Sequence, residues 1–452
     1  MNGRAAPPKT PRSAPPRAAR ARRGAGARSA AAPPAKTQRA RTRPAPPLPA
    51  RIARLVRLAA LPERRVLGLM SGTSLDGLDL ALCVLSGQGR GTALRLERFR
   101  TLPYRPAERE RLRALVSQPS VPLAELTVLH AWLAARHAEM VRASLAAWGV
   151  AAEQVHLLAS HGQTVYHAPG AWMEQGATRH ATLQLGDGDQ LAVRTGLLTV
   201  SDFRQKEIAA GGQGAPLAPY AEALLFSGPR PRILLNLGGI ANFTWLPAAG
   251  DSAPLLTGDT GPANCLIDRA VRRGFPRHPD GFDRDGRIAA SGRVHAELLG
   301  ELKRDTYYLR PCPKSTGPEA FGDAYLEAVW QRASALRVTP EDVVATLTRL
   351  TIETVAETLR RERPDLRRSE LYVSGGGRHN KVLTRGLREA LSGTTWRRAE
   401  SLGVPPDAKE AVLFAVLAHE SLFGEGFAAI APGLTAPQDG RRFGFGKLSW
   451  PD

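Results

Sequence analysis

Short apolar runs alternate with glycine-rich polar turns along most of this chain. The first example is an apolar run at residues 66–70, a polar stretch at 71–77 and a second apolar run at 78–85. Short apolar runs bounded by glycine predict buried strands, and the Asp-Gly pair between them predicts a hairpin turn. The tip carries glycines, hydroxyls and a carboxylate. Such a tip can bind phosphate and hydrated Mg²⁺, although the same residues also suit an ordinary surface turn.

The same pattern returns in the second half of the chain. Residues 232–246 again form an apolar run, a Gly-Gly turn flanked by Asn, and a second apolar run. Two half-chains that each begin with a glycine-tipped hairpin predict an α/β fold of two similar lobes, with a triphosphate in a cleft between them. The periodicity of apolar residues predicts helices at residues 107–149, 340–361, 381–391 and 408–423.

A third glycine turn follows the apolar run that begins at residue 371. The segment 371–380, LYVSGGGRHN, predicts a strand, a triple-glycine turn and the start of a helix. The N-terminus of a helix is a favourable place for the phosphates or the adenosine of a nucleotide. We therefore expect Gly375, Gly376 and Gly377 on the nucleotide side of the cleft.

Charge is concentrated at the N-terminus. The first 57 residues hold 15 Lys or Arg and no acidic residue, and they are mostly Ala, Pro and Arg. Such a segment has too little apolar surface to offset its ordering entropy, so residues 1–60 are predicted to be a disordered extension. It could be a basic arm for nucleic acid or anionic lipid, a transit peptide, or a segment from a misassigned start, and we favour the last.

The remaining residues suit two lobes, predicted at 61–230 and 231–452. Residues 66–452 carry a net charge of only +4 of the total +20, so the high charge belongs to the extension and is no evidence about the partners of the folded part. Nucleic acid is not expected as a partner. The three cysteines lack the spacing of a metal site or a disulfide framework, which favours a reducing compartment. Apolar runs of about eight residues are far shorter than a membrane span, so no membrane is expected.

Polar residues that follow apolar runs are candidates for a ligand site. Residues 160–167, SHGQTVYH, come after such a run, and His161, Gln163 and Thr164 offer donors and acceptors for a sugar. Asp202 also ends an apolar stretch and could be a general base, although for a lone Asp a helix N-cap or an ion pair with Arg204 is the favoured explanation. Asp259, in GDTGP, could orient Mg²⁺ or belong to an ordinary turn.

Nine segments, in order, resemble the anhydro-N-acetylmuramic acid kinase family, which has the actin/hexokinase/heat-shock-70 type of ATP-binding fold with ribonuclease H-like lobes. They span nearly all of residues 66–452. The segments are MSGTSLDGLD, HGQTVYH, LQLGD, SDFR with AAGGQGAPL, NLGGIANFT, DTGPANCLID, PKSTGPEAF, VSGGGRHN and PPDAKEAVLFAVLA. Two positions depart from the family pattern: Glu207 stands where Asp is common, and GDGD occupies residues 186–189.

The resemblance implies a kinase for 1,6-anhydro-N-acetylmuramic acid that acts in murein recycling. Water would open the 1,6-anhydro ring at C1, and the released O6 would take the γ-phosphoryl group of ATP. The products would be N-acetylmuramic acid 6-phosphate and ADP. Asp202 would be the base that deprotonates the water, and ATP with Mg²⁺ would be required.

The resemblance also assigns residues. Those expected to bind the nucleotide are Gly72, Thr73, Ser74, Leu75, Asp76, Gly77, Leu78, Asp79, Asn236, Gly238, Gly239, Asn242, Gly375, Gly376 and Gly377. Those expected to bind the sugar are His161, Gln163, Thr164, Arg204, Gly212 and Gln213. Asp76 and Asp259 are the candidates for Mg²⁺, and Lys409 and Glu410 could touch either substrate. A cytoplasmic bacterial enzyme and a homodimer are further implications.

Three alternatives stay open at this point. The chain could phosphorylate another 1,6-anhydro sugar such as levoglucosan, which lacks the lactyl carboxylate. It could be a non-catalytic, actin-like nucleotide switch, or a nucleic-acid-binding protein that acts through its basic arm. Glycines 211, 212 and 214, beside Asp202, could form a hinge or lid.

Overall fold

A computed structural model describes residues 48–452 except 73–74, 119, 175–176, 211, 252, 318–319, 364 and 425–443. The predicted extension therefore lies outside the described residues up to residue 47. No helix within the described ranges is both long and apolar enough to span a membrane.

Within the described residues the first sheet has seven strands. Its path runs β12-β6-β4-β1-β2-β3, and β5 pairs with β4. Strands β1, β2 and β3 form an antiparallel meander, while β4 is parallel to β1 and β6 is parallel to β4. The bounds are β1 (Glu63–Ser71), β2 (Gly77–Ser86), β3 (Ala93–Pro103), β4 (Leu157–Glu174), β5 (Ala177–Leu185), β6 (Thr199–Ser201) and β12 (Lys447–Ser449).

The second sheet repeats this plan with five strands in the order β11-β10-β7-β8-β9. Strands β7, β8 and β9 form the meander, and β10 is parallel to both β7 and β11. The bounds are β7 (Arg232–Leu237), β8 (Ile240–Leu246), β9 (Leu256–Pro262), β10 (Glu370–Ser374) and β11 (Thr395–Arg398). Two sheets with one shared order confirm the predicted α/β class with two ribonuclease H-like sheets.

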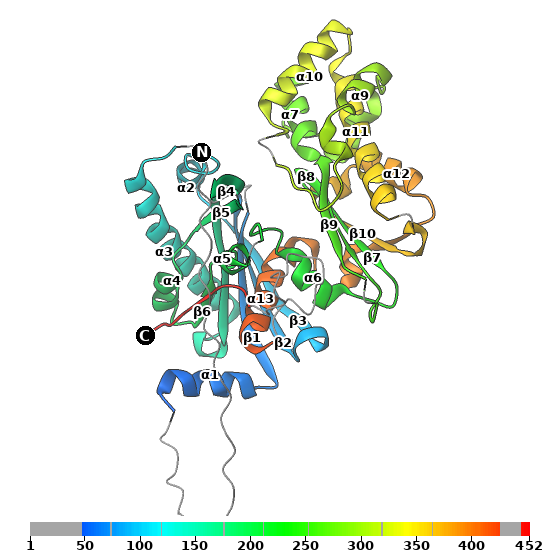
Figure 1. Cartoon of the computed structure of the whole chain (residues 1–452). Helices are drawn as coiled ribbons and strands as arrows, with labels where there is room; N and C mark the ends of the chain where they lie inside the picture. Colours follow the sequence, from blue (N-terminus) through cyan, green and yellow to red (C-terminus); the bar gives the residue numbers. More distant parts are fainter. Residues whose placement is uncertain are drawn as a thin grey trace, which may run out of the picture. The chain divides into compact units, whose positions relative to one another are not determined.

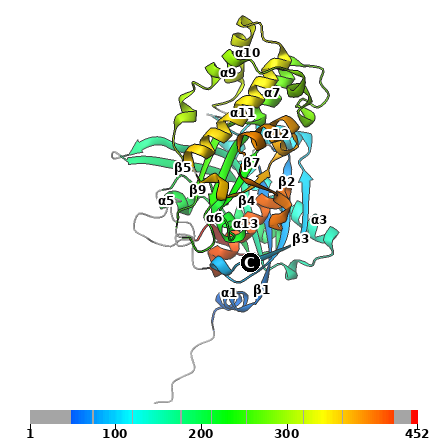
Figure 2. The same cartoon turned by 90° about the vertical axis from the view of Figure 1, so that its right-hand side faces the viewer.

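The helices fall into sets that go with the two sheets (Figures 1 and 2). The long helices α3 (Leu123–Trp148) and α11 (Pro340–Glu362) pack on the first and second sheet respectively. The predicted helix at 107–149 is interrupted, because α2 ends at Arg113 before α3 begins. The other bounds are α2 (Pro106–Arg113), α4 (Gly188–Thr195), α5 (Gln205–Ala209), α6 (Ala218–Phe226), α7 (Asn264–Gly274), α8 (Arg287–Ser291), α9 (Ala296–Leu302), α10 (Asp323–Ala335), α12 (Lys381–Ala390) and α13 (Lys409–Phe423).

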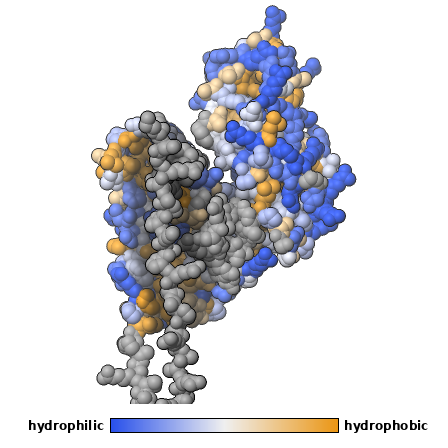
Figure 3. Space-filling model, viewed as in Figure 1, coloured by the Kyte–Doolittle hydropathy of each residue, from blue (hydrophilic) through white to orange (hydrophobic). Residues whose placement is uncertain are grey.

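The apolar side chains gather in the cores. Over α7, α9 and α10 the face seen in Figure 3 is mostly hydrophilic, with small apolar areas between. One core joins both sheets, since α6, α13 and the strand residues Val66 and Leu234 belong to the same buried cluster. The sheets therefore pack partly through shared helices, within the compact unit formed by residues 51–452.

Helix α13 lies unusually close to β1. A Cβ atom added to Gly68 would overlap the main-chain carbonyl oxygen of Ala411. Only glycine permits this approach, so the β1 sequence is matched to the helix that covers it.

The C-terminal segment returns to the first sheet. Helix α13 packs on β1, and β12 pairs with β6 through Leu448 and Val200. The predicted second lobe, 231–452, assigned both elements to the other half of the chain. The division into two lobes stays a prediction, but in the structure these two elements belong with the first sheet.

The predicted disorder of residues 1–60 is wrong for its last residues, because α1 (Ala50–Ala60) is a helix. Leu58 is buried in the core that holds Val66. Arg64, only 5% exposed, donates from Nε to the Leu58 carbonyl oxygen at 2.7 Å and from Nη2 to that of Ala59. The main-chain carbonyls of α1 therefore satisfy a buried guanidinium.

Deletion of residues 1–60 should lower the melting temperature by several degrees. The loss of Leu58 burial and of two acceptors for Arg64 should cost about 2–4 kcal/mol of unfolding free energy. Differential scanning calorimetry measures this, with a deletion of residues 1–47 as the control for which composition predicts no loss. Equal melting temperatures for both deletions would contradict a supporting role of α1.

Candidate functional site

The ends of three parallel strands bring the predicted first-sheet residues together. Strands β1, β4 and β6 run side by side, with Ser71 opposite Gln163 and Ser160 opposite Ser201. The carboxyl ends of parallel strands meet at one edge of a sheet, where α/β proteins bind ligands. The hairpin tip, the HGQT segment and Asp202 therefore lie at one edge.

Hydrogen bonds hold the base of the hairpin tip. The Gly72 carbonyl oxygen accepts from the Leu75 main-chain N–H at 3.2 Å and from Gln163 Nε2 at 3.3 Å. The Tyr104 main-chain N–H donates to the Asp76 carbonyl oxygen at 3.1 Å. Leu75 has a φ of 58° and is buried, so its side chain anchors the tip in the core. Thr73 and Ser74 lie outside the described residues.

Asp202 follows β6 directly in a strained conformation. Its φ of 53° is uncommon for a residue other than glycine, and such strain occurs often at functional sites. Its Oδ2 atom lies 2.5 Å from Lys447 Nζ on β12. Asp202 is not the N-cap of α5, because that position is Arg204. The Arg204 guanidinium donates to His161 and to the Gly214 carbonyl, so neither alternative explanation of Asp202 applies.

Arg204 links two predicted sugar-binding segments. Its Nη2 and Nε atoms donate to His161 Nε2 at 2.9 and 3.2 Å, and Nη1 donates to the Gly214 carbonyl oxygen at 2.6 Å. Burial and the Arg204 charge lower the pKa of His161 to about 3, so the imidazole is neutral and accepts through Nε2. Burial lowers the pKa of Arg204 to about 10, so it still carries its charge at neutral pH.

Glu207 holds the glycine loop from the other side. Its carboxylate accepts from the Gly214 main-chain N–H, and its carbonyl oxygen accepts from the Gly212 N–H at 2.9 Å. A Cβ atom on Gly212 would overlap this carboxylate. Glu207 stands where Asp is common in the family, and its longer side chain reaches the Gly214 N–H as a hydrogen-bond partner. Within its described residues the loop is tied down at Gly212 and Gly214, which does not suit the predicted hinge, while Gln213 is exposed.

Two predicted sugar ligands use their polar atoms within the protein. His161 is 2% exposed, and besides accepting from Arg204 it donates from Nδ1 to the Gly162 carbonyl oxygen at 3.0 Å. Gln163 is 0% exposed and bonds to Ser71, Gly72 and the Thr164 carbonyl. The Thr164 hydroxyl accepts from Gln184 at 3.3 Å. These contacts place His161 and Gln163 as supports, and direct contact with a sugar stays a prediction for all three.

The predicted nucleotide residues of the second sheet also come together. Strand β10 is parallel to β7 with Ser374 opposite Asn236, and Asn236 lies opposite Asn242 on β8. A Cβ on Gly375, whose φ is 81°, would lie 2.6 Å from Asn236 Oδ1. The Gly238 and Gly239 carbonyls accept from the Asn264 and Ala263 N–H groups at the start of α7. The triple-glycine turn and the Gly-Gly turn therefore flank the end of β7.

Charged residues connect the two clusters. Arg378, beside the triple-glycine turn, lies 3.8 Å from Asp407, just before α13. Asp407 in turn repels Asp79 of the first hairpin, and this repulsion, after burial, raises the pKa of Asp79. Glu410 is exposed and lies within electrostatic reach of Arg204 and Asp79. The residues predicted to bind the sugar, the phosphates and the nucleotide are thus linked through charged residues at the start of α13.

The two Mg²⁺ candidates lie on different sheets. Asp76 is exposed and pairs with Arg109 at 3.4 Å. Asp259, on β9, accepts from the Thr316 N–H at 2.8 Å and supports the segment around Lys314. No group of three or more His, Cys, Asp or Glu is arranged as a metal site within the described ranges. Asp76 and Asp79 lie within electrostatic reach of each other, and the Mg²⁺ role of Asp76 stays a prediction.

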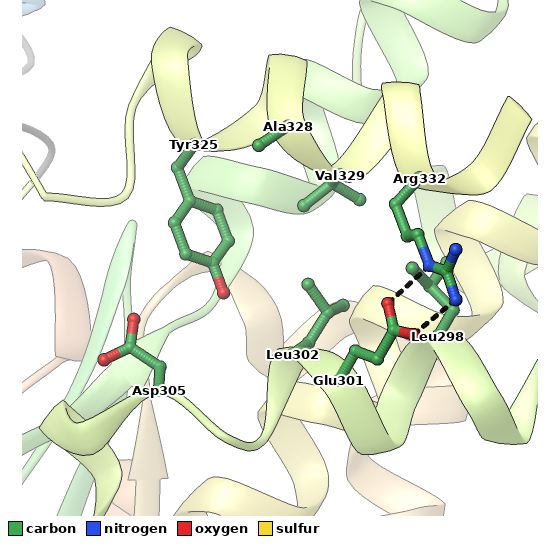
Figure 4. Close-up of a pocket in the computed structure, with 8 residues that line it drawn as sticks. All are labelled: Leu298, Glu301, Leu302, Asp305, Tyr325, Ala328, Val329 and Arg332. Carbon is green, nitrogen blue, oxygen red and sulfur yellow. Dashed lines mark hydrogen bonds and ion pairs between the residues drawn. The ribbon is translucent and has the colours of Figure 1, made fainter. Parts of the chain in front are cut away.

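A cavity of about 330 Å³ lies between α9 and α10, away from these clusters (Figure 4). Its walls include Leu298, Leu302 and Val329. On its rim, Arg332 is paired with Glu301 at 2.5 Å and with Glu297 at 2.8 Å. Because that cation is already neutralised and no predicted site residue lines the cavity, it does not suit a phosphate or a sugar acid.

Several site residues were missed by the sequence interpretation. Lys447 lies in a segment whose local pattern gives no indication of a role. Arg378 belongs to VSGGGRHN, which was recognised without assigning a role to this residue. Asp407 belongs to PPDAKEA, a segment that was recognised without assigning this residue. Only a three-dimensional pairing, such as β12 beside β6, brings Lys447 to Asp202.

Comparison with known proteins identifies the family. Residues 64–438 match the model of the family described as anhydro-N-acetylmuramic acid kinase. The anhydro-N-acetylmuramic acid kinase of Pseudoalteromonas atlantica is 41% identical over 406 residues, covering 89% of this chain and 99% of that protein. That of Pseudoalteromonas translucida is 43% identical, covering 83% and 93%. That of Streptomyces coelicolor is also 43% identical, covering 80% and 88%. The resemblance seen in the nine segments is confirmed, and the chain belongs to the anhydro-N-acetylmuramic acid kinase family.

Proposed function

We propose that the chain is an ATP-dependent kinase that opens the ring of 1,6-anhydro-N-acetylmuramic acid and phosphorylates O6, as part of murein recycling. One observation carries this proposal: Asp202 lies at the same sheet edge as the hairpin tip, in a strained conformation. A base for water and a site for the γ-phosphate beside each other suit a reaction in which both act on one sugar. The relatives' shared name supports the same substrate.

In the proposed reaction Asp202 removes a proton from water, whose oxygen bonds to C1 as the C1–O6 bond breaks. The freed O6 bonds to the γ-phosphorus of ATP, and ADP leaves. Asp202 is the only base that this scheme requires, because phosphoryl transfer depends mainly on positioning and charge neutralisation. Arg204 donates both to His161 Nε2 and to the Gly214 carbonyl oxygen, and in this scheme that bridge shapes the sugar side of the site.

The remaining residues have positioning roles in this scheme. The main chain at Gly72 and Gly77 and the turn at Gly238 would approach the phosphates, and the turn at Gly375 would face the adenosine. Mg²⁺, when bound, neutralises phosphate charge, and Asp76 and Asp79 would hold it. A homodimer and a cytoplasmic location are part of the proposal and rest on the family alone.

Incubation with a panel of anhydro sugars, ATP and Mg²⁺, followed by mass spectrometry, tests the function. We expect N-acetylmuramic acid 6-phosphate and ADP in equal amounts, and no ring-opened sugar with ADP or without nucleotide. We expect water to attack C1 only after the two lobes have closed around ATP, because closure excludes bulk water and prevents hydrolysis without phosphoryl transfer.

Each other result has a distinct meaning. Phosphorylation of levoglucosan in preference to the amino sugar would overturn the substrate. Nucleotide binding without phosphorylation of any sugar would favour an actin-like switch. Accumulation of free N-acetylmuramic acid without ATP would show hydrolysis that does not depend on phosphoryl transfer.

A further inference from the structure

A chain of buried hydrogen bonds connects α3 to the hairpin tip. His137 Nε2 lies 2.7 Å from the Tyr104 hydroxyl, which lies 2.9 Å from Ser71 Oγ. Ser71 Oγ lies 2.5 Å from Gln163 Oε1, and Gln163 Nε2 lies 3.3 Å from the Gly72 carbonyl oxygen. His137 and Gln163 are fully buried, and Ser71 and Tyr104 are 1% and 4% exposed. The chain runs from α3 through the residue that follows β3 to strands β1 and β4.

The direction of every bond in this chain follows from its chemistry. Gln163 Nε2 faces two carbonyl oxygens, those of Gly72 and Thr164, so the amide nitrogen must donate to them. Its Oε1 can only accept, and the Ser71 hydroxyl therefore donates to it. With that proton used, Tyr104 must donate to Ser71 Oγ.

His137 completes the chain by donating from Nε2 to Tyr104. Burial, aided by the charge of Arg136, lowers the pKa of His137 to about 3, so the ring is neutral and carries a single proton. Nδ1 has no hydrogen-bond partner in the described part of the chain, which agrees with a bare lone pair there. Each hydroxyl thus both accepts and donates, and such aligned bonds reinforce one another away from water.

Tyr104 holds both sides of the tip. Its hydroxyl acts through Ser71 and Gln163 on the Gly72 carbonyl, and its main-chain N–H donates to the Asp76 carbonyl at 3.1 Å. The two carbonyls bracket the segment between β1 and β2. Both carbonyls are therefore bound by donors from the protein, which restrains the main chain at Gly72 and at Asp76.

We propose that Tyr104 is a positioning residue for phosphate binding, and that the chain His137–Tyr104–Ser71–Gln163 sets the orientation of the Gly72 carbonyl at the start of the hairpin tip. This inference rests on the proposed function, in which that tip binds the phosphates of ATP. It also explains why Gln163, expected to bind sugar, has no free polar atom.

The test replaces Tyr104 with Phe in the full-length chain. The ring and its packing remain, but Ser71 loses its donor and His137 its acceptor. We expect the KM for ATP to rise about tenfold, the usual worth of one buried hydrogen bond, while the KM for the sugar changes less than twofold. Tyr372→Phe is the matched control, because that hydroxyl is also buried and bonded, to Glu370 Oε2 at 2.9 Å, outside this chain.

If the role of Tyr104 is purely structural, Tyr104→Phe and Tyr372→Phe should both lower the melting temperature, and the KM for ATP should be the same in the two variants. That result would overturn the proposal. Gln163→Glu is a second variant of the same size, whose carboxylate repels the Gly72 carbonyl instead of donating to it. It should raise the KM for ATP at least as much as Tyr104→Phe, and an unchanged KM would also overturn the proposal. If Gly72→Val leaves ATP binding unchanged, the phosphate site itself is wrong. If Gly72→Val abolishes binding while Tyr104→Phe has no effect, only the positioning role fails.

Discussion

Asp202→Asn should cut turnover by about a hundredfold or more and leave the affinity for ATP nearly unchanged. The amide keeps the shape of the side chain and its hydrogen bonding, but it cannot take a proton from water. Asp202 is on the edge beside the hairpin and its φ is 53°, so the backbone already directs the side chain. Steady-state kinetics with the anhydro sugar, together with calorimetric titration of ATP, measures both quantities.

The control for this substitution is Asp323→Asn. Asp323 also pairs with a cation, Arg269, at 2.9 Å, but its side chain is 91% exposed in the first turn of α10. It should keep full turnover. Near wild-type turnover in the Asp202 variant would remove this residue from its assigned role. A parallel loss of ATP binding would mean that the ion pair with Lys447 organises the whole site.

Gly72→Val should lower the affinity for ATP at least tenfold while the fold survives. A branched side chain would stand where the main chain must approach a phosphate, and it would restrict the backbone beside Leu75, whose φ is 58°. Isothermal titration calorimetry with ATP and Mg²⁺ gives the affinity, and circular dichroism reports the fold.

Gly91→Val provides the comparison within the same lobe. A Cβ atom added to Gly91 meets no described atom within 4 Å, and its φ is not in the left-handed region. This variant should bind ATP like the wild type. If Gly72→Val also does so, the hairpin is not the phosphate site.

The sequence predicted the repeating parts of the fold well because each follows a local pattern. The apolar runs around residues 71–77 gave β1 and β2, and the predicted helix at 408–423 is α13 to within one residue. Glycine turns at strand ends pointed to the nucleotide residues that the structure brings together. These features depend on neighbours in the chain, so a pattern of a few residues is enough to predict them.

What the sequence did not predict depends on distant partners. β12 has three residues, too few for a period-2 pattern, and only its pairing with β6 makes it a strand. Helix α1 adjoins an arginine-rich stretch that favoured disorder, yet Leu58 and the carbonyls that bind Arg64 tie it to the core. At the site, the sugar contacts of His161 and Gln163 stay predictions, but no local pattern showed that these side chains hydrogen-bond to Arg204 and Ser71, which lie in other segments.

The return of α13 to β1 has a consequence for the order in which the chain acquires structure. Gly68 and Ala411, whose backbones lie close together, are separated in sequence by the entire second sheet, so the core between β1 and α13 cannot close until the last helix has left the ribosome. The second sheet, from β7 to β11, is continuous in sequence and needs no later strand. We therefore expect the second sheet to fold first during synthesis. The apolar face of β1 then stays exposed to solvent until α13 has been synthesised and packs on it.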